Sequence, residues 1–155
     1  MFDLEKYIET FNSGDDKAMV DNFWVDDLVV ASGRADKEGG ILARGKEDWL
    51  KFLAGVHDGI REIIRIQFLM QNEDNIFAEI DMDFHASKDR PDYTFGPLKA
   101  GDFITVKMFA LYFLRGDKIA KLKLASWPAN VGVSDPPTRV FGPPPPIVGK
   151  VRRQF

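Results

Sequence analysis

Four long segments in the second half of the chain alternate apolar and polar residues, and this pattern constrains the fold most. They are REIIRIQFLMQ (61–71), NIFAEIDMDFHAS (75–87), DFITVKMFALYFLR (102–115) and KIAKLKLASW (118–127). A two-residue period is typical of a β-strand with two different faces. The short turns NED and GD join neighbouring segments as hairpins. We therefore expect one strongly curved, mainly antiparallel sheet.

The first half has helical spacing instead. The expected helices cover residues 2–12, about 16–24 and 46–56, and a short strand pair covers 28–32 and 41–45. Asp15 or Asp16 is expected to cap the second helix. Helices followed by long antiparallel strands are typical of an α+β domain, so we predict about three N-terminal helices packed in the hollow of the sheet.

The chain changes character after Trp127. Its last part, PANVGVSDPPTRVFGPPPPIVGKVRRQF, is rich in proline. Proline lacks the N–H that a sheet needs and has a restricted φ, so we expect an extended tail rather than a sheet strand. Residues 1–128 are thus expected to form the domain. Residues 129–155 are expected to be a lid over a pocket or an arm onto a second subunit, with a loose tail as the alternative.

Composition excludes several classes of function. The net charge is −3, which gives no long-range attraction to nucleic acid or to an anionic membrane. The chain has no cysteine, and neither metal-ligand spacing nor a phosphate-binding loop occurs. We therefore expect no metal and no cofactor. The N-terminus lacks the pattern of a signal peptide, and no apolar run approaches the ~20 residues of a membrane span, so a cytoplasmic protein is expected.

The order of helices and strands resembles the nuclear transport factor 2-like superfamily over roughly residues 3–128. YIETFNSGDDKAM is similar to the first-helix region of that superfamily, FWVDDLVV to the entry into the first strand, and GDKIAKLKLASW to the final hairpin. Ketosteroid isomerases, scytalone dehydratase, limonene epoxide hydrolase and the SnoaL-type polyketide cyclases are members. The resemblance implies a cone with an apolar interior, in which polar groups have perturbed pKa values.

The resemblance implies roles for two residues of this chain. Tyr7 is similar to the oxyanion-donating tyrosine of ketosteroid isomerases, or it is a core tyrosine. The isomerase base would fall near Ser32 and a second acidic donor near Phe109, so steroid isomerisation by that mechanism is not expected. Dehydratases of the superfamily place a catalytic histidine just after the third helix, at the start of a strand. Counting from the NEDN turn puts Arg61 there, where its guanidinium can hold an oxyanion.

The strand FAEIDMDFHAS poses the question of which side faces the interior. Ala78, Ile80, Met82 and Phe84 make the better apolar wall. The carboxylates of Glu79, Asp81 and Asp83 are then expected to face solvent or a subunit interface, because like charges in an apolar cone repel one another. The alternative places one or two carboxylates inside.

Three cationic or titratable residues remain as candidates. His85 is a candidate base if a bulge turns it inward; scytalone dehydratase has a histidine one position away, and one residue reverses the side of a strand. Lys107 interrupts an apolar strand, so it is either catalytic or a lysine at a dimer interface. His57 is expected to be structural, because a helix C-terminus stabilises a protonated imidazole.

We therefore predict a cofactor-independent lyase of the dehydratase type, which acts on an apolar, hydroxylated aromatic molecule. The predicted catalytic residues are Tyr7, Arg61, His85 and Lys107, and the predicted substrate-binding residues are Trp24, Trp49, Phe84, Phe109 and Trp127. An isomerase or polyketide-type cyclase would use the same groups. A non-catalytic ligand-binding or dimerisation module is the alternative from another class. A homodimer or higher homo-oligomer is expected.

Overall fold

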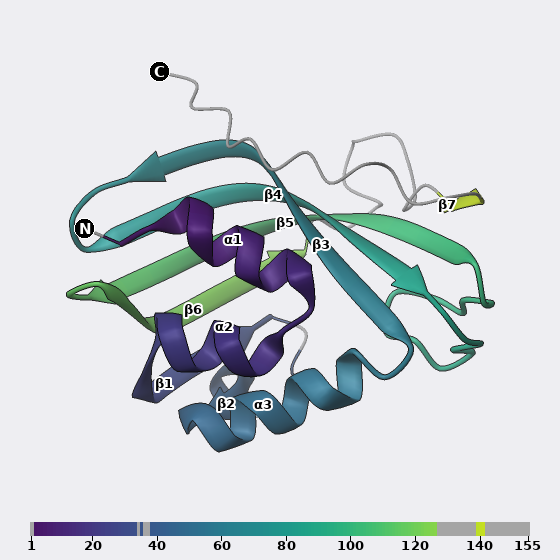
Figure 1. Cartoon of the computed structure of the whole chain (residues 1–155), viewed down its shortest axis with the longest axis horizontal. Helices are drawn as coiled ribbons and strands as arrows, with labels where there is room; N and C mark the ends of the chain where they lie inside the picture. Colours follow the sequence, from purple (N-terminus) through teal and green to yellow (C-terminus); the bar gives the residue numbers. More distant parts are fainter. Residues whose placement is uncertain (1, 34, 36–37, 127–138, 142–155) are drawn as a thin grey trace.

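The computed structural model describes residues 2–33, 35, 38–126 and 139–141, whose arrangement is shown in Figure 1. The elements in chain order are α1 (Leu4–Ser13), α2 (Asp16–Phe23), β1 (Trp24–Ser32), the 3₁₀ turn η1 (Glu38–Gly40), β2 (Ile41–Arg44), α3 (Gly45–Val56), β3 (Ile60–Gln71), β4 (Asn75–Ala86), β5 (Asp102–Arg115), β6 (Lys118–Ser126) and β7 (Arg139–Phe141). The strands form one sheet in the order β2-β1-β6-β5-β4-β3, with β7 beside β5. The architecture is α+β, as predicted.

The three helices lie on one side of the curved sheet (Figure 1). We call that side the inner face and the opposite side the outer face. On β4, Ala78, Ile80, Met82 and Phe84 are 0–6% exposed and belong to the core. This confirms the predicted apolar wall, since the two-residue period sends the intervening side chains to the outer face.

Local signals in the sequence set the ends of the first two helices. Asp3 accepts a hydrogen bond from the Lys6 N–H at 3.0 Å at the start of α1, and Gly14 ends it with a φ of +81°. Glycine adopts this left-handed conformation without steric cost. Asp15, rather than Asp16, caps α2 by accepting from the Ala18 N–H at 2.9 Å. Capping by Asp15 leaves the carboxylate of Asp16 free for another contact.

One buried polar side chain joins α1 to the edge of the sheet. Asn12 is 3% exposed. Its amide nitrogen donates to the Ile64 carbonyl at 3.0 Å, and its amide oxygen accepts from the Ile64 N–H at 2.7 Å. The Asn12 amide thus pairs with β3 much as a neighbouring strand would, which satisfies the outward backbone groups of an edge strand.

The sheet is wider than the four predicted strands. β1 begins at Trp24, earlier than the expected residue 28, and it pairs with β2 on one side and β6 on the other. The β1–β6 pairing is parallel, while the other described pairings are antiparallel. Short-range periodicity does not reveal this pairing, because its strands lie far apart in the chain.

The tail departs from prediction at one place. Arg139–Phe141 forms β7 and pairs antiparallel with β5, although the whole tail was expected to stay outside the sheet. The physical reason is local: these three residues lie between the two proline clusters and keep their N–H groups. Residues 127–138 and 142–155 lie outside the described part of the chain, so the predicted lid or arm is not located.

Within the described residues, no helix has the length and apolar character needed to cross a membrane. The same residues contain no cluster of three or more histidine, cysteine, aspartate or glutamate side chains placed to hold a metal ion.

Candidate functional site

A cluster of three titratable side chains forms where α2 begins, α3 ends and β3 starts. His57 directly follows α3 as its C-cap. Its Nδ1 lies 2.7 Å from Oδ2 of Asp16, the first residue of α2. Its Nε2 lies 3.7 Å from Oε1 of Glu62 on β3. The side chains are 16%, 23% and 12% exposed for His57, Asp16 and Glu62 respectively, so the cluster is largely buried.

The two carboxylates determine the protonation state of His57. Burial alone would lower the pKa of His57, but hydrogen-bonding contacts with Asp16 and, more weakly at 3.7 Å, with Glu62, together with the charges of both carboxylates, raise it to about 9. The ring is therefore an imidazolium at neutral pH, with a proton on each nitrogen. His57 is then suited to donate a proton rather than to act as a base.

One of these two protons has no hydrogen-bond acceptor. The Nδ1–H of His57 donates to Asp16, whereas Nε2 is buried and without a hydrogen-bond partner. Its 3.7 Å contact to Glu62 is an ion pair too long for a hydrogen bond. An oxygen placed between these groups could lie within hydrogen-bond distance of both, accepting from Nε2–H and donating to the carboxylate. A hydroxyl group meets both requirements.

A second polar pair lies deeper on the inner face. Tyr7 on α1 and Tyr112 on β5 are 2% and 3% exposed, and their rings meet edge to face at 5.9 Å. Burial and the hydrogen bond to Tyr112 raise the pKa of Tyr7 well above 10. Burial raises the pKa of Tyr112 to about 12, while its hydrogen bond with Tyr7 acts to lower it. The two hydroxyls thus interact with each other in a buried place, where both remain protonated at neutral pH.

The structure does not bring the four predicted catalytic residues together. Tyr7 lies inside. Arg61 is exposed, and its Nη2 donates to the Asn12 carbonyl at 2.6 Å, where a cation suits the C-terminus of α1. His85 and Lys107 lie on the outer face. Residues directly opposite each other on neighbouring strands share a face, and the partners here are Phe103 for His85 and Asp81 for Lys107.

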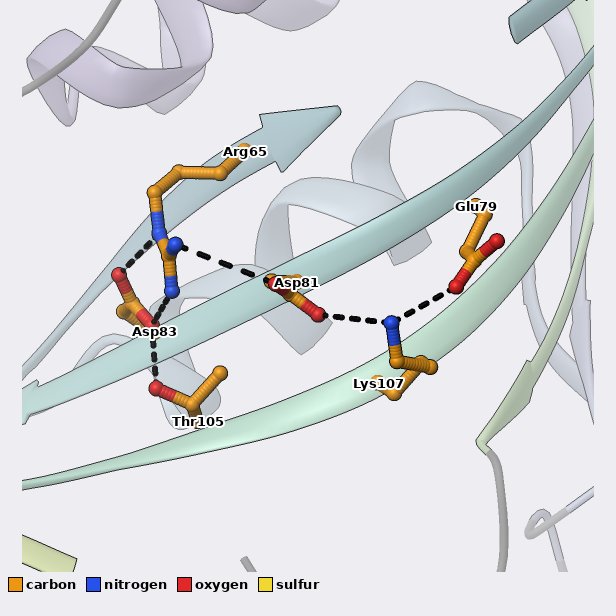
Figure 2. A network of polar contacts seen from close by, with 6 residues as sticks. All are labelled: Arg65, Glu79, Asp81, Asp83, Thr105 and Lys107. Atoms are coloured by element: carbon orange, nitrogen blue, oxygen red, sulfur yellow. Dashed lines mark hydrogen bonds and ion pairs between the residues drawn. The ribbon is translucent and has the colours of Figure 1, made fainter. Parts of the chain in front are cut away.

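The outer-face residues are engaged in contacts of their own. The His85 ring stacks on Phe103 at 4.7 Å, and burial lowers the pKa of His85. Figure 2 shows Lys107 Nζ between Glu79, at 2.7 Å, and Asp81, at 3.3 Å. The hydrogen bond to Glu79 raises the pKa of Lys107, which favours a structural cation over a base.

The polar contacts drawn in Figure 2 run across three neighbouring strands, β3, β4 and β5, and we call them the charge chain. Arg65 binds both oxygens of Asp83, at 2.7 and 2.8 Å, and Thr105 donates to the same carboxylate. The Asp83 side chain is only 1% exposed, and the bidentate guanidinium contact offsets the cost of burying it.

The predicted substrate-binding residues also separate. Trp24 and Trp49 are buried with ring centroids 5.9 Å apart, and the Trp49 Nε1–H has no hydrogen-bond partner. Phe84 is on the inner face and 1% exposed. Phe109 is on the outer face, stacked on Phe77 at 6.0 Å. Trp127 lies outside the described residues.

His57, expected to be structural, is indeed the C-cap of α3, but its contacts with Asp16 and Glu62 were not foreseen from the sequence. The resemblance implied a histidine just after the third helix, at the start of a strand. The structure places Arg61 there, as the second residue of β3, whereas His57 is the C-cap of α3. For Asp16 the signal was the pair of aspartates, because one cap needs only one carboxylate.

Comparisons with known proteins find the fold. No protein-family model matches the sequence, and no curated protein matches it. A solved structure from Xanthomonas campestris pv. campestris, of a protein proposed to be a polyketide cyclase, is similar with a TM-score of 0.62 and 20% identity over 79% of this chain and 85% of that one. An LEH-like epoxide hydrolase of Mycobacterium tuberculosis has a TM-score of 0.59 and 11% identity over 79% and 78%.

A third similar structure is a protein with a ketosteroid isomerase-like fold from Catenulispora acidiphila, solved with trimethylamine. Its TM-score is 0.55, with 15% identity over 76% of this chain and 79% of that one. At these identities the likeness concerns the fold alone. The chain therefore has the nuclear transport factor 2-like fold that the order of its elements predicted.

Proposed function

We propose that the protein is a cofactor-independent lyase of the dehydratase type, acting on a hydroxylated, apolar aromatic molecule. One observation carries the proposal: the buried Nε2–H of His57 has no hydrogen-bond partner and faces Glu62 across 3.7 Å. A substrate hydroxyl group lying beside both atoms would give the Nε2–H its acceptor.

Each group of the site has a role in this reaction. The His57 imidazolium, held by Asp16, donates its proton to the hydroxyl oxygen as the C–O bond breaks, which releases water. The Glu62 carboxylate takes the proton from the neighbouring carbon, and the electrons of that C–H bond form the new double bond. The Tyr112 hydroxyl, positioned by Tyr7, holds negative charge that develops on a substrate oxygen. Proton transfer from Glu62 back to His57 restores the site.

The test is an assay without added cofactor. Purified protein is incubated with hydroxylated aromatic dimers, polyketide mimics and epoxides, and products are identified by mass. Loss of one water supports the lyase, whereas a product of unchanged mass indicates an isomerase that uses the same groups. Binding without turnover of any substrate would instead support a non-catalytic carrier.

His57→Gln and His85→Gln are a matched pair of variants, because the proposed site contains only the first histidine. His57→Gln and Glu62→Gln are each expected to lower turnover by about 100-fold or more, since one positioned proton transfer contributes ~10²–10⁴-fold. Catalytic roles for Arg61, His85 and Lys107 stay predictions. Turnover that survives His57→Gln but is lost in His85→Gln or Lys107→Met would place the reaction on the outer face and contradict the proposed site.

We also propose that the outer face binds a second copy of this chain. The helices cover the other side of the sheet. The face exposes Met70 (56%) and presents the stacked rings of Phe77 and Phe109 beside the charge chain of Figure 2. Each of those charges contacts a charge of opposite sign within the chain, so covering the two cations and three carboxylates leaves one net negative charge rather than five separate ones. The oligomeric state in solution tests this proposal.

A further inference from the structure

The connection between β4 and β5, residues 87–101, is much longer than the hairpin turns at 72–74 and 116–117. Long connections in compact domains are commonly functional. This one has its own pairing: the Arg90 N–H donates to the Leu98 carbonyl at 2.7 Å, and the Leu98 N–H returns a hydrogen bond at 3.0 Å. The segment therefore has a defined structure of its own, and we call residues 87–101 the wall.

The wall is fastened to the turn that directly follows His57. Lys88 pairs with the Asp58 carboxylate at 2.6 Å, and Arg90 donates to the Asp58 carbonyl at 2.6 Å. Gly59 lies against Lys88 so closely that a Cβ there would come within 2.3 Å of the lysine side chain. These contacts hold residues 87–101 next to the His57 cluster.

Two aromatic rings of the wall pack against the residue that lies opposite Glu62 in the sheet. Phe84 is the cross-strand partner of Glu62, and both lie on the inner face. Tyr93 meets the Phe84 ring at 5.5 Å, and Phe95 stacks on it at 5.0 Å. Burial, and then the nearby charge of Glu62, raise the pKa of Tyr93, as expected for a phenol beside that carboxylate. Tyr93 is 7% exposed, whereas Phe95 is half-buried.

We infer that residues 87–101 form the aromatic wall of the substrate site, where Tyr93 and Phe95 bind a substrate ring whose hydroxyl group lies between His57 and Glu62. Flat rings gain about two- to tenfold in affinity from such contacts beyond burial alone. The wall thus selects aromatic over saturated alcohols. This inference rests on the proposed function for the placement of the hydroxyl group.

The experiment compares two probes of similar shape, 1-naphthol and its saturated analogue decahydro-1-naphthol, by isothermal titration calorimetry. Wild-type protein is expected to bind 1-naphthol about fivefold more tightly, and Phe95→Leu is expected to remove most of that preference. Phe113→Leu, an equivalent change on the outer face, should keep it. Equal affinities, no binding of 1-naphthol, or an unchanged preference in Phe95→Leu would overturn the inference.

A second measurement does not depend on how well the variants fold. Intermolecular NOEs in the wild-type protein should connect naphthol ring protons to the rings of Tyr93 and Phe95. NOEs confined to Trp24 and Trp49 would overturn the wall. An aromatic preference with these NOEs, but without turnover of any substrate, would support the wall while the lyase proposal fails. Turnover without aromatic preference would do the reverse.

Discussion

At the scale of single residues, the site depends on a proton held between two carboxylates. The pKa of His57 is about 9 in the folded protein, against about 6.5 for an unperturbed histidine. Since the folded pKa is the higher one, the protonated ring stabilises the fold fully below pH 6.5. That contribution, up to about 3 kcal/mol, is lost as the pH rises through 9.

The first prediction follows from this difference. The free energy of unfolding, measured by urea denaturation, should fall between pH 6.5 and 9, and His57→Gln should flatten that slope. The chain has two histidines, so NMR titration can assign both. The His57 midpoint is expected near 9, and the His85 midpoint below 6.5 because burial lowers the pKa of His85. A His57 midpoint at or below 6.5 would contradict the cluster.

Two neighbouring aspartates, Asp15 and Asp16, allow helix capping and the stabilisation of protonated His57 to be tested separately. Asp16→Asn removes the charge beside Nδ1 and should lower the pKa of His57 by about one unit or more. Asp15→Asn keeps a good helix cap and should leave that pKa unchanged. NMR titration of His57 in both variants measures the difference. Equal effects of the two substitutions would show that Asp16 does not hold the proton.

At the scale of elements, Asn12 connects the end of α1 to the edge strand β3. Asn12→Ala would leave the Ile64 N–H and carbonyl unpaired in a buried place, at a cost of about 1–3 kcal/mol. Asn22→Ala, on the exposed side of α2, is the control and should change stability little. The midpoint of urea denaturation measures both. A loss in Asn12→Ala no larger than in Asn22→Ala would contradict this connection.

The elements also show what the sequence can predict. The alternation in β4 fixes which side chains share a face, so the burial of Ala78 and Phe84 could be foreseen. No such period links Asp16, His57 and Glu62, which come from the ends of three elements and meet only when those elements pack. The same limit hid the parallel pairing of β1 with β6 and the pairing of Tyr7 with Tyr112. Local patterns therefore predict the helices, the strands and their buried faces, but not which side chains from distant elements come into contact.

At the scale of the whole molecule, the outer face is the surface on which we propose that a second copy of the chain binds. Sedimentation velocity should show a dimer if that face binds a second copy. Lys107→Glu would replace the cation between Glu79 and Asp81 by a third carboxylate, so a dimer would have to bury unpaired negative charge and should weaken about tenfold or more. The Lys107 side chain is 40% exposed, so in the monomer water screens the lost ion pair and the new repulsion, which each cost about 0–1 kcal/mol. The variant should therefore still fold.

The same change of charge away from the sheet is the control. Lys51→Glu, on the exposed side of α3, gives an identical net charge and should leave the dimer intact. Weakening in Lys107→Glu alone would locate the contact on the outer face, since a general effect of net charge would act in both variants. A protein that is monomeric at all concentrations, or a dimer indifferent to Lys107→Glu, would refute the proposal. It would leave the charge chain of Figure 2 as a brace between β3, β4 and β5.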